Sequence, residues 1–167
     1  SPSNPAGGAG VVTPQGQDWH AVQNRYDAWA NQPGQQYARF RDGGESQYQC
    51  TGWANFRWAE LGYSGPPIHG NGGAMAANAG ATTGQPSLHA MASYGAGTDK
   101  SPGHVMIVEE VSGDGARMRV SEMNVGDKNW EVGLPNEYRD TNWISRAADG
   151  SWKSWRGDPI SFAAFPG

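Results

Sequence analysis

Cys50, the only cysteine of this chain of 167 residues, has the surroundings that a nucleophile needs. The segment CTGWANFRWAEL has apolar residues at helical spacing, so the thiol falls at the start of a predicted helix. Unpaired N–H groups and the dipole at a helix N-terminus lower the pKa of a thiol, and a nearby imidazole lowers it further. A single cysteine is more often a small buried residue, so its neighbours must decide between packing and catalysis.

His104 is the best partner for this thiol among the four histidines. It follows a Pro-Gly turn and begins a strongly apolar strand predicted over residues 105–111. His20 lies on a polar helix face, and His69 and His89 lie in or near Gly-rich segments. His104 is therefore the candidate general base, with a satisfied structural histidine as the alternative.

Glu122 and Asn124 are candidates for orienting the imidazole of His104. A three-residue loop at 113–115, with glycine in the left-handed position, would join two antiparallel strands and place His104 opposite Asn124. Glu122 would then lie diagonally from His104 on the same face, whereas a four-residue loop would put these two residues on opposite faces. The alternative reading is a strand end (residues 117–124) that emerges into solvent.

The periodicity of the chain predicts helices first and strands afterwards. Helices are expected from Asp18, as the cap, to about Asn31, from Cys50 to near Leu61, and over 74–79. Strands are expected over 88–94, 105–111, 117–124, 142–147 and 160–165, with no internal repeat.

Composition limits both the organisation and the partners of the chain. Its length suits one domain over residues 17–167, and residues 1–16 form a Pro/Gly/Ser-rich flexible linker that would tether a neighbouring domain. A net charge of −4 without a Lys/Arg run argues against binding nucleic acid or an anionic membrane surface. The chain lacks an apolar run near the ~20 residues that span a bilayer.

Three motifs in this order resemble the CHAP family, the cysteine, histidine-dependent amidohydrolases/peptidases. They are QYQCTGWA at 47–54, GHVMIVE at 103–109 and SEMN at 121–124. The segment GNGGAMA at 70–76 is also similar to a family segment, although Met75 stands where the family usually has an aromatic residue.

This resemblance covers about residues 18–165 and implies a papain-like α+β fold. N-terminal helices would pack on an antiparallel sheet of about five to six strands. By position, Cys50 matches the nucleophile, His104 the general base, and Glu122 with Asn124 the residues that orient it.

The resemblance also implies hydrolysis of an amide bond in peptidoglycan through an acyl-enzyme. The bond would lie in the stem peptide or cross-bridge (an endopeptidase) or between sugar and peptide (an N-acetylmuramoyl-L-alanine amidase). Such a protein would be secreted or associated with the cell wall, and a phage-derived lysin fits as well. The alternatives are a non-catalytic cell-wall binding module, and a cysteine hydrolase or acyltransferase effector that acts on another amide.

Two further sets of residues complete the predicted site. Gln47 or Gln49 would add a second oxyanion donor beside the backbone N–H of the nucleophile. Most of the eight Trp residues should fill the core, and a few would line the substrate groove. The groove candidates are Trp53, Trp130 and Trp143.

No cofactor is expected. The His, Cys and Asp residues do not have the spacing of a zinc site. Some CHAP proteins bind calcium just before the cysteine, but here only Asp42 and Glu45 stand there, and calcium prefers six or more oxygen ligands. A calcium site near these two residues stays open as an alternative.

Overall fold

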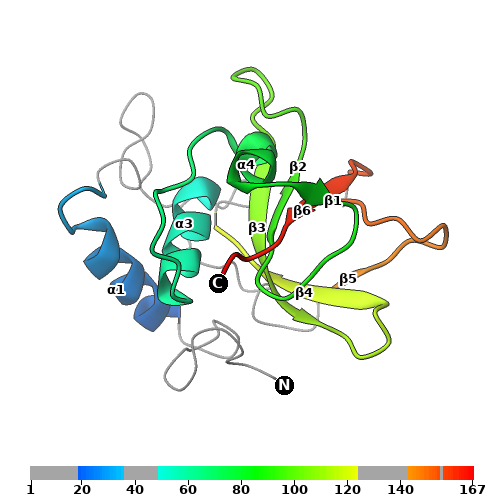
Figure 1. Cartoon of the computed structure of the whole chain (residues 1–167), viewed down its shortest axis with the longest axis horizontal. Helices are drawn as coiled ribbons and strands as arrows, with labels where there is room; N and C mark the ends of the chain where they lie inside the picture. The colour runs from blue at the N-terminus through cyan, green and yellow to red at the C-terminus, as the bar shows by residue number, and fades with distance from the viewer. Residues whose placement is uncertain (1–18, 36–48, 124–142, 155) are drawn as a thin grey trace.

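The computed structural model describes residues 19–35, 49–123, 143–154 and 156–167. Figure 1 shows its helices gathered on one side of a sheet, which confirms the predicted α+β fold. The helices are α1 (Trp19–Ala30), α3 (Cys50–Glu60) and α4 (Gly72–Ala79). Within the described residues, no helix has the length and apolar character required to cross a membrane.

Among the described residues the sheet has six strands, all paired antiparallel, in the order β1-β6-β2-β3-β4-β5. This agrees with the expected five to six strands. The strands are β1 (Thr82–Thr83), β2 (Met91–Tyr94), β3 (His104–Val111), β4 (Arg117–Ser121), β5 (Trp143–Ser145) and β6 (Ile160–Ala163).

Helix α3 begins at Cys50, as its apolar periodicity predicts. Gln49 caps it with an extended backbone, and its carbonyl accepts the first helical hydrogen bond, from the Trp53 N–H at 2.9 Å. The helix ends at the predicted place, because Leu61 is the C-cap and Gly62 takes the left-handed conformation (φ 106°) that glycine tolerates best. The thiol therefore stands in the first turn.

The sheet separates two apolar cores. The first lies between the sheet and the helices, and the second covers the opposite face, where Trp152 packs against the strands. Alternation along β3 divides its residues between them, with Val105 and Ile107 toward the helices and Met106 and Val108 away from them. Helix α3 is thus anchored on β3 by its buried aromatic side chains.

The hairpin between β3 and β4 differs from the prediction near its loop. Ser112 pairs with Arg117, donating its N–H to the Arg117 carbonyl at 2.8 Å, so the loop has four residues and the predicted three-residue loop is wrong. The Asp114 carboxylate causes the extension, because it accepts hydrogen bonds from the Ser112 hydroxyl (2.7 Å) and the Ala116 N–H (3.0 Å). Gly115 does take the predicted left-handed conformation, with φ 71°.

A β-bulge at Glu109 then restores the predicted register. Val108 pairs with Val120 and Ile107 with Ser121, while Glu110 pairs with Arg119, so Glu109 is the extra residue on β3. The one-residue shift of the longer loop is cancelled before β3 reaches His104. On the site side of the bulge, β3 and β4 therefore have the same relative register, and present the same pairs of faces, as the three-residue loop had predicted.

The remaining strand boundaries differ by a few residues. The strand expected from residue 88 begins at Met91, because His89 has a left-handed backbone (φ 66°) and Ala90 closes a turn on Ser87. The short strand β1 had no signal in the sequence. Its two residues are exposed and pair with Phe162 and Ala163 of β6 only through the tertiary fold.

Candidate active site

Cys50 lies at the N-terminus of α3 and is half-buried, not enclosed in the apolar core. Its sulfur makes a hydrogen bond with the side chain of His104, which begins β3. The contact joins residues 54 positions apart and depends on the packing of α3 on β3. The thiol is therefore beside an imidazole and in the first turn of a helix, where backbone N–H groups have no acceptor within the helix itself.

Glu122 holds the other side of the imidazole. His104 Nε2 lies 2.7 Å from Glu122 Oε1, and the two side chains are 9% and 13% exposed. Because the carboxylate accepts, Nε2 donates this hydrogen bond, which leaves Nδ1 as the ring nitrogen for Cys50. The three side chains form one line, from sulfur to imidazole to carboxylate.

The charges in this line favour an imidazolium. Burial by itself would lower the pKa of His104, but the charge of Cys50 and its hydrogen bond raise it, as do the hydrogen bond and charge of Glu122. Together they raise the pKa of His104 from its ordinary 6.5 to about 10. The contact has the geometry of a cysteine–histidine pair, in which a thiolate can face an imidazolium.

Two contacts of His104 have no counterpart in the sequence reasoning. Tyr94 pairs with it across β2 and β3, and the rings pack at a centroid distance of 5.5 Å. The start of α4 touches its backbone, since a Cβ on Gly72 would lie 2.8 Å from the His104 Cα. Only the register of β2 on β3 could have indicated Tyr94, and a single sequence does not give that register.

Among the described groove candidates, Trp53 requires a correction. It is fully buried, and its indole N–H donates to the Ser121 hydroxyl at 2.9 Å, so it is a core residue that lines no groove. Trp143 is half-buried on the edge strand β5, with the guanidinium of Arg117 4.7 Å from its ring centroid.

The other predicted residues are only partly described. Gln49 stands directly before Cys50, and its side chain makes no cap hydrogen bond to α3. The remaining residues lie outside the described part of the chain. They are Asn124, Gln47, Trp130, Asp42 and Glu45.

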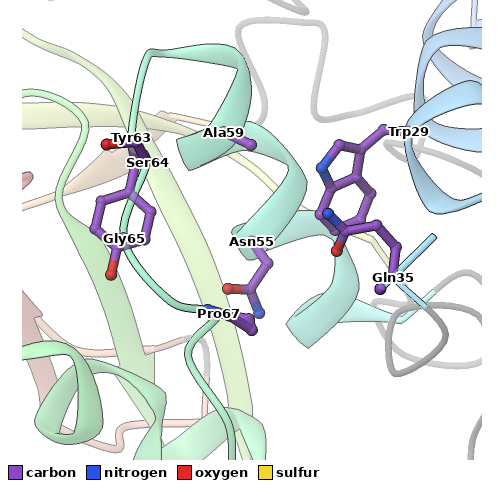
Figure 2. A pocket seen from close by; sticks show the side chains of 9 residues that line it. Trp29, Gln35, Asn55, Ala59, Tyr63, Ser64, Gly65 and Pro67 are labelled. Atoms are coloured by element: carbon purple, nitrogen blue, oxygen red, sulfur yellow. The ribbon is translucent and has the colours of Figure 1, made fainter. Parts of the chain in front are cut away.

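A pocket of about 250 Å³ lies elsewhere, between α1, α3 and the loop that follows α3 (Figure 2). Asn55 and Ala59 of its wall come five and nine residues after Cys50, which places them on the other side of the helix. The Asn55 amide nitrogen donates to the Ile68 carbonyl at 2.9 Å, and its amide oxygen accepts from the Ile68 N–H at 2.8 Å. The Tyr63 hydroxyl donates to the carbonyl of Pro66. This pocket is separate from the thiol.

The line from Cys50 to Glu122 has the parts that acyl transfer requires. A thiolate can attack a carbonyl carbon, an imidazolium can protonate a leaving group, and a carboxylate can orient the imidazole. Within the described ranges, no three His, Cys, Asp or Glu side chains are grouped as metal ligands.

Comparison with known proteins agrees with this geometry. The family model described as CHAP domain matches residues 41–124, half of the chain, and this range contains Cys50, His104 and Glu122. No curated protein and no solved structure matches the chain. Proteins with this domain are typically cysteine- and histidine-dependent amidohydrolases and peptidases related to peptidoglycan. The chain belongs to the CHAP family.

Proposed function

We propose that this protein is a peptidoglycan hydrolase that cleaves an amide bond with Cys50 as its nucleophile. The observation that carries the proposal is the hydrogen-bonded line of Cys50, His104 and Glu122 at the start of α3. The bond lies in a stem peptide or cross-bridge, or between N-acetylmuramic acid and L-alanine. Such an enzyme works outside the cytoplasm, as a secreted, wall-associated or phage-derived protein.

In the first half-reaction, the Cys50 sulfur forms a bond with the substrate carbonyl carbon. The carbonyl oxygen becomes an oxyanion near the helix start, where the backbone N–H of Cys50 and the side chain of Gln47 or Gln49 donate to it. The imidazolium of His104 gives its proton to the amine nitrogen as the C–N bond breaks. The products are a free amine and a thioester.

In the second half-reaction, neutral His104 takes a proton from water. The resulting hydroxide attacks the thioester carbon, the C–S bond breaks, and the acid product leaves with Cys50 again a thiolate. Glu122 keeps the ring oriented through both steps, and Asn124 shares this role. Trp130 and Trp143 remain candidates for contact with sugar or peptide.

The decisive experiment is clearing of a cell-wall suspension by the native protein and by Cys50→Ala. Loss of turbidity with the native protein alone supports the enzyme. Equal clearing by both would contradict Cys50 as the nucleophile, and binding of both without clearing by either would leave a wall-binding module as the function. Mass spectrometry of the fragments then names the bond: new amine termini are expected, and their absence from digested peptidoglycan would favour an effector that acts on another amide.

We further propose that the reaction needs no cofactor. Activity on cell walls should survive dialysis against EDTA, because every chemical step above uses a side chain or backbone group of the protein. Activity that EDTA abolishes and calcium restores would contradict this and would direct attention to Asp42 and Glu45.

A further inference from the structure

Behind the candidate active site, two fully buried charged side chains join α3 to β3. Glu109 accepts from Arg57 Nε at 2.8 Å and from Arg57 Nη2 at 2.9 Å, a bidentate geometry. Arg57 also donates to Glu60 at 2.9 Å, and Glu60 pairs with Arg25 at 2.7 Å, so the charges balance. A buried pair gains little net stability because desolvation offsets its attraction. What it does supply is a directional contact at a defined place.

Two further hydrogen bonds extend this pair toward the active site. The Ser121 hydroxyl donates to Glu109 Oε2 at 2.7 Å and accepts from Trp53 Nε1 at 2.9 Å. Arg57, Glu109, Ser121 and Trp53 are each at most 2% exposed. We call these four residues the α3 anchor.

Every member of the α3 anchor is attached to an element that carries a residue of the proposed site. Trp53 is one turn after Cys50 on α3, and Ser121 directly precedes Glu122. Glu109 is the bulge residue of the strand that His104 begins. The anchor therefore fixes the helix of the thiol relative to both strand ends (Figure 1 shows α3 beside β3).

Apolar packing alone would fix α3 less firmly. A side-chain atom about 5 Å from a helix axis moves by about 1.3 Å when the helix turns by roughly 15°. A displacement of about 1 Å at a reacting group can cost roughly 100-fold in rate. Directional hydrogen bonds at two successive turns of α3 resist such a rotation, whereas aromatic side chains can repack.

We infer that Ser121 and Glu109 are positioning residues. They hold α3 in the orientation about its own axis that keeps the Cys50 sulfur in contact with the imidazole of His104. This inference rests on the proposed function. It extends that function to residues that touch neither the thiol nor the imidazole in the described contacts. Its chemical consequence is that the thiolate is preformed only while the anchor is intact.

The test is the pH dependence of Cys50 alkylation by iodoacetamide in the full chain. The variants are Ser121→Ala and Glu109→Gln, with Ser112→Ala and Glu110→Gln as matched controls from the loop end of the same strands. In Ser121→Ala the alkylation rate near pH 6 should fall about tenfold, with the midpoint moving toward the ordinary thiol value of about 8.5. Near pH 9.5 the rate should stay within about twofold of the native one, since any accessible thiol is then ionised.

The outcomes separate positioning from stability. A lower melting temperature of Ser121→Ala with an unchanged alkylation profile overturns the inference, because the anchor would then only stabilise the fold. A control that shifts as much as Ser121→Ala overturns it too. If Glu109→Gln does not fold, Ser121→Ala decides alone. A native protein whose thiol titrates near 8.5 contradicts the proposed function itself, whatever the variants do.

Discussion

Replacement of Glu122 by glutamine tests the electrostatics of the proposed site most directly. The glutamine side chain is close in shape and its amide oxygen can still accept from His104 Nε2, so the variant removes the charge and keeps the hydrogen bond. An opposite charge within about 4–6 Å shifts a pKa by about 1–3 units. Both native side chains keep some exposure, 9% and 13%, and the Cys50 charge remains, so we take the lower part of this range.

The expected shift is therefore roughly 1–2 units, or about 1.4–2.7 kcal/mol. In the native protein, kcat/KM on peptidoglycan should fall at alkaline pH as the imidazolium of His104, with its pKa raised to about 10, loses its proton. In Glu122→Gln this alkaline limb should move to lower pH by the same 1–2 units. The measurement is kcat/KM from about pH 6 to about pH 10.5, repeated with Glu110→Gln as the control.

An alkaline limb that stays in place in Glu122→Gln would refute the reasoning. It would mean that the limb reports another group, or that the carboxylate does not act on the ring. A limb that moves equally in Glu110→Gln would refute it as well, since that carboxylate faces Arg119 at 3.4 Å and not His104.

Three other substitutions have defined outcomes. Gly103→Ala should lower the free energy of unfolding by about 2 kcal/mol or more in chemical denaturation, because φ is 72° and a Cβ would meet backbone on two sides. The control Gly113→Ala, where a Cβ meets open space, should change this free energy little. Asn55→Ala should cost about 3 kcal/mol in the same measurement, since it leaves buried backbone groups unpaired. Cys50→Ser should abolish wall clearing and keep the melting temperature within a few degrees, and a collapsed thermal transition would argue for a structural thiol.

The sequence by itself determined which elements carry the chemistry. Apolar residues at helical spacing after Cys50 predict α3 and its first residue, because local backbone preference and one buried face decide where a helix starts. The same kind of local pattern predicts the strand that His104 begins. The order of the three motifs was enough to indicate the CHAP family, which the family comparison confirms.

The predicted register of the β3–β4 hairpin was right near the site, but the reason given for it was incomplete. The prediction of a three-residue loop considered backbone geometry alone. In the structure the Asp114 carboxylate accepts two hydrogen bonds within the loop and lengthens it by one residue. The β-bulge at Glu109 cancels that shift, and nothing local in the sequence marks it. Its side chain turns toward α3, where the guanidinium of Arg57 pairs with it.

Only the tertiary structure decided what lies behind the site. Trp53 was a groove candidate because helical periodicity cannot tell a buried aromatic from one beside a cleft, and the acceptor of its indole N–H, Ser121, is 68 residues away. The pairing of Arg57 with Glu109 spans 52 residues and depends on α3 crossing β3. Such contacts are set by packing between elements, and packing is a property of the assembled fold, not of a local segment.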